Sequence, residues 1–416
     1  MVTIPLLYRK EKVRIAQISC GTEWSGIQPE LDKVAELVGA EIFFPEASLE
    51  EIELGVEKLG FSPVSHSLRV MLGQAIALEN YRDVDGILLL TCFRCAEGSL
   101  TRTVLRRYLQ GRFNLPIITY SYTERTKAEN LLLRLEALAN LIRKRPLLEV
   151  KRQEGVSLGL DSGSSWTKAV LMEEGEVVGF SALPTTDILD TALKVVEKAV
   201  NGAKTRFSVG SDPVGVTGYG RHLLGPKFNA KVAMEEITVC AKGATFLTDQ
   251  HTGDATIIDI GGNDNKAIST HDGIPYNFTV GGVCAGASGR FLEVAAARLG
   301  VSVNELGELA LRGNPSNIRM NAYCIVFGIQ DIVAALAAGA KKEDVAAAAC
   351  FSVAEQFFEQ QLQEIEVRSP IIEIGGTSLN RGLVRAIEKI THSQVKVPPH
   401  SQFAGAVGAA VLASNA

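Results

Sequence analysis

The chain has 416 residues, of which 46% are hydrophobic and 21% charged, and this length predicts two or three domains. A net charge of −5 argues against a nucleic-acid partner, and no apolar run reaches the ~20 residues that span a bilayer. The first twelve residues carry charges where a secretory signal needs an apolar core, so we expect a cytoplasmic protein that binds neither nucleic acid nor membrane. Disulfides are rare in that compartment, which makes the seven cysteines candidates for metal or redox chemistry.

Residues 13–150 alternate short apolar runs with amphipathic stretches. The runs at 13–19, 41–46, 85–92 and 114–122 predict strands, and residues 29–39, 101–110 and 128–144 have helical spacing. This alternation favours a parallel sheet covered by helices on both faces. The charged segment 143–155 lacks periodicity and is the predicted linker. We therefore expect a small α/β domain over residues 1–150 and a second domain over residues 155–416.

Two hairpins of similar sequence mark the second domain. In each, an apolar strand ends in an aspartate, Asp161 or Asp259, which is followed by a glycine turn and then by Lys168 or Lys266. A duplicated hairpin predicts two similar lobes that face one another across a cleft. A third glycine turn, at residues 375–377, follows another apolar strand near the C-terminus.

These turns have the composition of phosphate-binding loops, because glycine and serine leave backbone N–H groups accessible. The usual pattern G-x-x-x-x-G-K-[ST] is absent. The carboxylates of Asp161 and Asp259 are suited to holding Mg²⁺ through water, since this ion takes only one or two carboxylates. Either hairpin alone favours an ordinary β-hairpin, whereas the three glycine turns together favour a site that holds a triphosphate from two sides.

In this order, the three turns resemble the two phosphate loops and the adenosine loop of the actin, sugar-kinase and heat-shock protein superfamily. The resemblance implies a duplicated, ribonuclease H-like actin fold that binds ATP with Mg²⁺. The implied catalytic residues are Asp161, Asp259 and Glu236, of which Glu236 either orients the attacking water or caps a helix. The implied ATP-binding residues are Ser162, Gly163, Ser164, Ser165, Lys168, Gly261, Gly262, Asn263, Lys266, Gly375, Gly376 and Thr377.

Two cysteines, Cys284 and Cys324, each precede a stretch with helical spacing. Each thiol is therefore expected at a helix N-terminus, where the partial positive charge favours thiolate. Two thiolates cannot complete the four of a [4Fe–4S] cluster, but two chains related by a two-fold axis can. The residues alone leave three interpretations open: a cluster shared in a homodimer, a shared zinc site, and inert buried thiols.

From Val156 to the end, the chain resembles the BadF/BcrA-type ATPases, which include activators of 2-hydroxyacyl-CoA dehydratases. The matching segments, in family order, are GLDSGSSWTK, TGYGR, EITVCAKG, IIDIGGNDNK, CAGASGRFLE, CIVFG and IGGTSLN. The resemblance implies that Cys284 and Cys324 hold one [4Fe–4S] cluster between two protomers. It also implies that ATP hydrolysis moves a helix and sends a low-potential electron to a partner. Two departures stand out: Asn263 replaces a frequent glutamine, and VFGIQD after Cys324 lacks a common glutamate.

Three further cysteines lie in the first domain. Cys92 and Cys95 form C-x-x-C at the end of one predicted strand, and Cys20 follows another. Because the ends of parallel strands lie side by side, the three thiols are predicted to converge, either as a second metal site or as a group without metal. Residues 85–142 resemble the C-terminal lobe of dehydratase partner subunits, in which a cysteine near the match to Cys95 ligates a cluster.

The fusion of these two parts resembles a family of methanogenesis marker proteins. This implies a methanogenic archaeon and the reductive activation, in methanogenesis, of a metalloenzyme or its activation complex. The implied electron donor is a ferredoxin or flavodoxin. Two alternatives are a small-molecule kinase on the same fold and a nucleotide-gated assembly scaffold without turnover.

Overall fold

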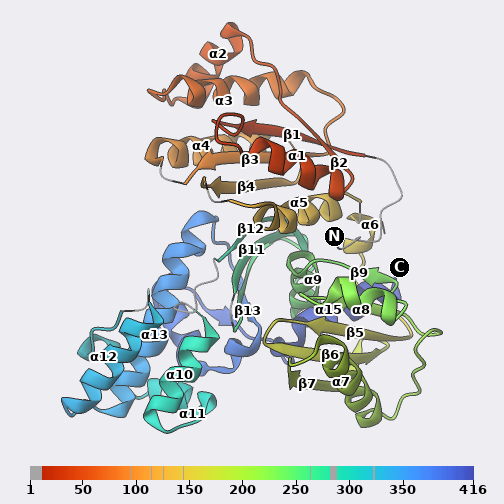
Figure 1. The fold of residues 1–416 in the computed structure, drawn as a ribbon, viewed down its shortest axis with the longest axis vertical. Coiled ribbons are helices and arrows are strands. Elements are labelled where there is room, and N and C mark those ends of the chain that lie inside the picture. Colours follow the sequence, from red (N-terminus) through yellow and green to blue (C-terminus); the bar gives the residue numbers. More distant parts are fainter. Residues whose placement is uncertain are drawn as a thin grey trace. The chain divides into compact units, whose positions relative to one another are not determined.

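The computed structural model (Figure 1) describes residues 12–93, 95–113, 115–124, 126–143, 145–262, 264–281, 288–321 and 324–416. The chain divides into two compact units, Met1–Arg145 (unit 1) and Pro146–Ala416 (unit 2). Within the described ranges, no helix combines the length and the apolar character that crossing a membrane requires.

Unit 1 is a parallel sheet of four strands in the order β2-β1-β3-β4, as the alternating pattern predicts. Helices α3 and α4 pack on one face through a core that includes Leu72 and Leu105, and α1 and α5 pack together on the other. The elements are β1 (Val13–Ser19), α1 (Gln28–Leu37), β2 (Ala40–Phe43), α2 (Leu49–Leu59), α3 (His66–Ala77), β3 (Gly86–Cys92), α4 (Ala96–Arg112), β4 (Ile117–Tyr122) and α5 (Ala128–Arg143).

Unit 2 contains two five-stranded sheets of the same construction. Their orders are β7-β6-β5-β8-β9 and β12-β11-β10-β13-β14. In each, an antiparallel three-stranded hairpin is extended by two parallel strands. The strands are β5 (Val156–Ser162), β6 (Trp166–Glu173), β7 (Glu176–Pro184), β8 (Val214–Thr217), β9 (Val232–Ala233), β10 (Asp254–Ile260), β11 (Asn265–His271), β12 (Ile274–Val280), β13 (Ile371–Ile374) and β14 (Val395–Lys396). The predicted duplication is therefore present in the fold.

The helices of unit 2 follow the same repeat, with extra helices in the second lobe. The first lobe has α7 (Ile188–Gly202), α8 (Arg221–Lys227) and α9 (Glu236–Thr248). The second has α10 (Gly289–Leu299), α11 (Val303–Ala310), α12 (Ile325–Ala337) and α13 (Lys342–Gln360) before β13, then α14 (Arg381–Thr391) and α15 (Ala404–Ser414). Figure 1 shows α10 to α12 on the outer side of the second lobe.

Helices α9 and α15 pack against each other between the two sheets, with α15 on β5 and β8. Their backbones touch at Gly243 and Gly408, where an added Cβ would collide with carbonyl groups of the other helix. Small residues thus permit a close approach that positions the two sheets relative to each other.

Two regions differ from the prediction made from the sequence: the helices α2 and α3 of unit 1, and the segment 143–155. Helices α2 and α3 lie in a region without a sequence assignment, although α2 begins with a complete capping box formed by Ser48 and Glu51. The expected linker at 143–155 contains a short helix, α6 (Arg145–Leu148). The buried ammonium group of Lys242 in α9 donates to the carbonyls of Leu148, at 2.8 Å, and Val150. This segment is therefore anchored to unit 2.

Candidate nucleotide site

The two predicted phosphate hairpins share one register. Asp161 lies directly opposite Lys168 in the β5–β6 pair, and Asp259 lies directly opposite Lys266 in the β10–β11 pair. Opposite residues in an antiparallel pair point to the same face of the sheet. Each lobe therefore presents one carboxylate and one ammonium group at the end of its first strand.

The turns of the two hairpins close in the same way and meet. The N–H groups of Gly163 and Gly261 each donate to the carbonyl three residues further on, at 3.1 and 2.8 Å. A Cβ on Gly262 would lie 2.9 Å from the hydroxyl oxygen of Ser165, so the first turn faces the second at contact distance. Asn263, predicted for the second turn, lies outside the described residues.

A glycine follows β8 in the first lobe and β13 in the second, and it contacts the aspartate of that lobe. Gly218 has φ 91° and Gly375 has φ 86°, values that favour glycine. A Cβ on Gly218 would lie 2.9 Å from Oδ1 of Asp161, and one on Gly375 would collide with Oδ1 of Asp259. Gly218 was not among the predicted site residues, although T-G-Y-G-R after a strand repeats the pattern of I-G-G-T-S.

The two lysines have different charge environments. The ammonium group of Lys266, almost fully buried, has three carboxylates within 4 Å: Asp264 at 2.7 Å, Glu236 at 2.8 Å and Asp259 at 3.6 Å. Among the described residues, Lys168 has one carboxylate within that distance, Asp161 at 3.6 Å. Lys266 is held in place by the protein, whereas Lys168 retains capacity for a further anion.

Glu236 lies at the start of α9 but is not its cap. The N-cap residue is the buried Glu235, whose carboxylate accepts from the N–H of Thr238 at 3.2 Å. The carboxylate of Glu236 instead points to the ammonium group of Lys266. Of the two roles left open by the sequence, helix capping thus belongs to Glu235.

Burial and charge compete at both aspartates. Burial raises the pKa of Asp161 to about 6, although the Lys168 ammonium group acts to lower it. Burial likewise raises the pKa of Asp259, against the opposing effect of Lys266. Two incompletely neutralised carboxylates in one buried site are suited to a divalent cation, which would stabilise their charged forms.

One buried thiol belongs to the same cluster and was not predicted. Cys240, one turn after Glu236 in α9, is 5% exposed. Burial raises its pKa well above the ordinary value, and the charges of Asp259 and Asp161 add to the rise. Cys240 therefore contributes an uncharged thiol to the site. The sequence contained no signal for this position beyond its helical spacing from Glu236.

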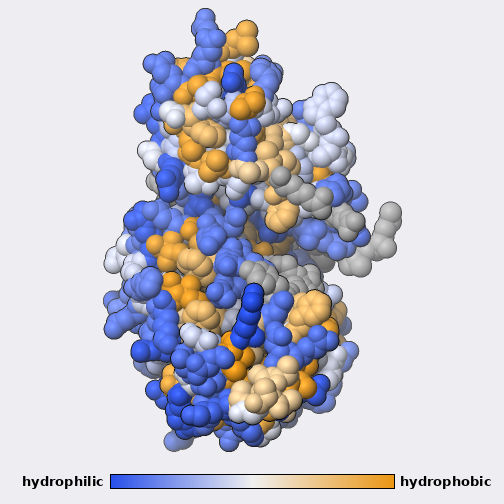
Figure 2. Space-filling view, turned by 90° about the vertical axis from the view of Figure 1, so that its left-hand side faces the viewer, coloured by the Kyte–Doolittle hydropathy of each residue, from blue (hydrophilic) through white to orange (hydrophobic). Residues whose placement is uncertain are grey.

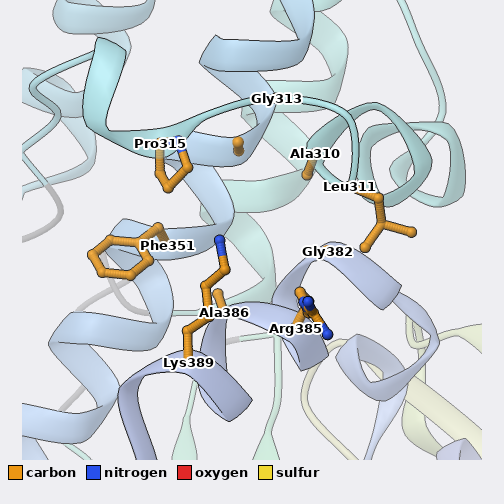
Figure 3. Close-up of a pocket in the computed structure, with 10 residues that line it drawn as sticks. Ala310, Leu311, Gly313, Pro315, Phe351, Gly382, Arg385, Ala386 and Lys389 are labelled. Carbon is orange, nitrogen blue, oxygen red and sulfur yellow. The ribbon is translucent and has the colours of Figure 1, made fainter. Parts of the chain in front are cut away.

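Two cavities lie along α14, the helix that follows the third glycine turn. A cleft of about 570 Å³, within the usual size range of ligand pockets, is lined by Leu311, Ser378, Leu379, Arg381, Val384, Arg385, Glu388 and Val397. Of the predicted turn, Thr377 donates its hydroxyl to the carbonyl of Ile260 at 2.7 Å, and a Cβ on Gly376 would meet open space. A smaller cavity of about 140 Å³, into which Lys389 points (Figure 3), lies between α11, α13 and α14.

Cys324 is the N-cap residue of α12 and is partly exposed, at the helix N-terminus that the sequence predicts. Its side chain does not cap the helix, so the first N–H groups of α12 are not taken by this thiol. Cys284 lies outside the described residues. Within the described part of the chain, no three His, Cys, Asp or Glu side chains already surround a common metal position.

Two lobes of the same topology, each with an aspartate, a lysine and glycine turns directed at the other, define an ATPase of actin-like fold. A family model for the BadF/BadG/BcrA/BcrD ATPase family matches residues 158–413, and the chain belongs to this family.

Known relatives fall into two groups by coverage. An uncharacterized protein of Methanocaldococcus jannaschii is 52% identical over 98% of both chains. The solved activator of 2-hydroxyisocaproyl-CoA dehydratase from Clostridium difficile, with bound ADPNP, is 31% identical, with a TM-score of 0.57 over 62% of this chain and 94% of its own. Component A of the (R)-2-hydroxyglutaryl-CoA dehydratase of Acidaminococcus fermentans is 28% identical, with a TM-score of 0.56 over 63% of this chain and 98% of its own. These matches confirm the predicted actin-like fold.

Proposed function

We propose that this ATPase drives low-potential electron transfer to a partner metalloenzyme. Solved relatives are named as an activator and a component of dehydratase systems, and one of them binds ADPNP. The observation that carries the proposal is a direct backbone connection between the second phosphate turn and the cysteine-bearing part of the second lobe.

The triphosphate of ATP would lie between the two glycine turns, with Lys168 as the cation able to turn toward it. Asp161 and Asp259 would hold Mg²⁺ through water, because each is the last but one residue of a strand, beside a turn that leaves backbone N–H groups accessible. Glu236, which pairs with Lys266 at 2.8 Å, would orient the attacking water. The adenosine would occupy the 570 Å³ cleft beyond the third glycine turn.

The connection begins at the second phosphate turn. The N–H of Gly289, the first residue of α10, donates to the carbonyl of Gly261 at 2.9 Å, and the N–H of Arg290 donates to that of Gly262 at 3.3 Å. A shift of this turn on ATP hydrolysis would therefore pull on the start of α10, which follows the segment containing Cys284.

The connection continues from α10 to α12. A Cβ on Gly328 of α12 would lie 2.6 Å from the ring of Phe291 in α10, so the two helices are in tight contact there. Gly328 lies one turn after Cys324, and its N–H donates to the Cys324 carbonyl at 2.9 Å. Cys324 is thus linked to the second phosphate turn through close-packed atoms and backbone hydrogen bonds.

Cys284 and Cys324 of two copies would supply the four thiolates of one [4Fe–4S] cluster, which provides one-electron chemistry at low potential. The outer face of α12 supports a second copy as the occupant. Val326, Phe327 and Val333 are about half exposed, at 57%, 54% and 48%. Figure 2, which faces the side on which α12 lies in Figure 1, shows hydrophobic groups at the surface there. An apolar face beside a partly exposed thiol fits a homodimer.

The partner would be a metalloenzyme, or its activation complex, in methanogenesis, and a ferredoxin or flavodoxin in the cytoplasm would supply the electrons. Relatives named for dehydratases and for a benzoyl-CoA reductase support an enzyme partner. The sequence resemblance supports methanogenesis.

Iron analysis of anaerobically purified protein tests the proposal. A shared cluster predicts that Cys324→Ala loses about two irons per chain relative to the parent. Cys350→Ala, which removes a thiol buried in the core of the same lobe, is the matched control and should retain them. Retention of all iron by Cys324→Ala, or a zinc-loaded parent dimer, would contradict the redox part. ATP-dependent formation of a phosphorylated small molecule would instead indicate a kinase.

A further inference from the structure

The smaller cavity, of about 140 Å³, lies between α11, α13 and α14, and the electron transfer proposed above does not use it. Close packing fixes its walls. A Cβ on Gly382 of α14 would lie 2.6 Å from the Cβ of Ala310 in α11. A Cβ on Gly313, after α11, would collide with the carbonyl of Glu343 in α13. The helices around the cavity thus meet at contact distance, so its shape is largely pre-formed.

The charged residues that line this cavity are two cations of α14, Arg385 and Lys389, and none of its described lining residues is acidic. They lie one turn apart, so their side chains are neighbours on one face of the helix. Arg385 has a carboxylate within 4 Å, that of Glu388 at 3.9 Å, whereas Lys389 has none among the described residues. The helix dipole favours a lysine in the last turn of α14, but it does not explain an arginine one turn earlier in the same cavity.

Carboxylates on the neighbouring helices are held by other groups. Asp344 of α13 accepts from the N–H of Asn314 at 2.9 Å and from the side-chain amide of Asn317 at 2.8 Å. Glu308 of α11 pairs with Arg381 at 3.2 Å. These side chains leave the positive charge at the cavity without a close counter-ion, and an external anion can supply one.

Other parts of the wall are apolar. Pro315, in the short 3₁₀ helix Pro315–Asn317, and Phe351 of α13 both line the cavity. Figure 3 shows the Lys389 side chain extending toward Pro315, with the Phe351 ring beside it. A protein cavity of about 150 Å³ can hold benzene, so about six non-hydrogen atoms fit here. An inorganic ion would leave the apolar wall uncovered, whereas a small organic acid would use both kinds of wall.

We propose that this cavity binds a small organic acid, whose carboxylate lies between Arg385 and Lys389. Its hydrocarbon part packs against Pro315 and Phe351. The guanidinium and ammonium groups both donate charge-assisted hydrogen bonds to the carboxylate, and the apolar contact keeps water away from these bonds. The site uses residues of the second lobe of unit 2 only, so binding does not require an iron–sulfur cluster.

Arg385 connects this site to the larger cleft, because it lines both. A carboxylate that holds its guanidinium group in the smaller cavity changes the wall of the cleft proposed for adenosine. The organic acid and the nucleotide therefore alter each other's affinity, by the same factor in both directions. This regulatory step rests on the proposed function, whereas the binding of the acid does not.

The first experiment titrates the full chain, without nucleotide, with butyrate, butyramide or inorganic phosphate in separate calorimetric measurements. Butyrate and butyramide share one carbon chain and differ in charge. We expect butyrate to bind with a dissociation constant in the millimolar range or tighter, and the other two probes to bind at least about tenfold more weakly. Equal binding of butyrate and butyramide, or no binding of butyrate, would overturn the proposal, and tighter binding of phosphate would overturn the organic ligand.

Lys389→Gln, at an exposed position where folding is not at risk, should weaken butyrate binding by about tenfold or more, because it removes a charged donor. Lys198→Gln, at an exposed position of α7 in the first lobe, is the matched control and should bind butyrate as the parent does. Unchanged butyrate affinity in Lys389→Gln would place the acid elsewhere and overturn the proposed site.

The second experiment measures ADPNP affinity with and without saturating butyrate. We expect a change of at least about fivefold in the parent and no effect of butyrate in Lys389→Gln. Unchanged ADPNP affinity in a parent chain that binds butyrate would refute the regulatory step alone. A chain that binds butyrate but no ADPNP would instead contradict the proposed function and leave the acid site in place.

Discussion

The buried carboxyl group of Glu373 should make the stability of unit 2 fall as the pH rises. Glu373 lies on β13 and is fully buried, and neither of its carboxyl oxygens has a hydrogen-bond partner among the described residues. Burial raises its pKa from 4.5 to about 8, and the charges of Asp259 and Glu388 add to the rise. Between these two values the folded chain holds a proton that the unfolded chain releases.

The sign and size of the effect follow from proton linkage. Because the folded state binds more protons, the free energy of unfolding falls as the pH rises through this window and levels off above about 8. At about 1.4 kcal/mol for each unit of pKa difference, the loss between pH 6 and pH 8 is roughly 2 kcal/mol. Glu373→Gln removes the titration, so the variant should gain this amount relative to the parent over the same interval.

Urea denaturation of both proteins at pH 6, 7 and 8, each carrying Trp24→Phe so that Trp166 in β6 is the remaining tryptophan, measures this difference for unit 2. Glu355→Gln, at an exposed position of α13, is the matched control and should follow the parent at every pH. A difference between Glu373→Gln and the parent that stays constant from pH 6 to 8 would refute the reasoning. It would mean that Glu373 does not change its protonation in this range.

Three further variants address the site and its connections. Asp259→Asn should lower ATP hydrolysis by roughly 10²-fold or more, because it removes a charge proposed to hold Mg²⁺; hydrolysis within threefold of the parent would exclude that role. Gly328→Ala, with a Cβ 2.6 Å from Phe291, should keep ATP hydrolysis but lower the electrons transferred per ATP; Gly202→Ala, whose Cβ meets open space, is the control. Phe327→Asp should convert the proposed dimer to a monomer in sedimentation experiments while ATP binding persists, and a stable dimer of this variant would place the interface elsewhere.

The repeated parts of unit 2 were predictable because their chemistry is local. An apolar strand, an aspartate, a glycine turn and a lysine are consecutive in the chain, and the antiparallel register then fixes Asp161 opposite Lys168. The position of Cys324 at a helix start was predictable for the same reason, since apolar residues at helical spacing follow it directly.

Other features depend on contacts between distant segments and could not be predicted from spacing. A Cβ on Gly405 of α15 would lie 2.7 Å from Oδ2 of Asp161, yet small residues in an apolar helix are common for many reasons. The assignment of the N-cap to Glu235 and not to Glu236 depends on where α9 begins. A shift of one residue in the helix start would change which carboxylate caps the helix. Helix α2, in contrast, could have been predicted, because the capping box formed by Ser48 and Glu51 is visible in the sequence.

The difference between the lobes explains why only one of them is proposed to transmit the nucleotide state. After the third strand of each hairpin, the chain returns to the phosphate turn: Thr185 donates to the carbonyl of Ser165 at 2.9 Å, and Gly289 donates to that of Gly261 at 2.9 Å. In the first lobe a single helix, α7, then leads to β8, whereas in the second lobe α10 to α13 intervene before β13. Cys324 lies within this insertion. A backbone contact that belongs to the repeated fold therefore becomes, in the second lobe alone, the connection between a phosphate turn and a thiol.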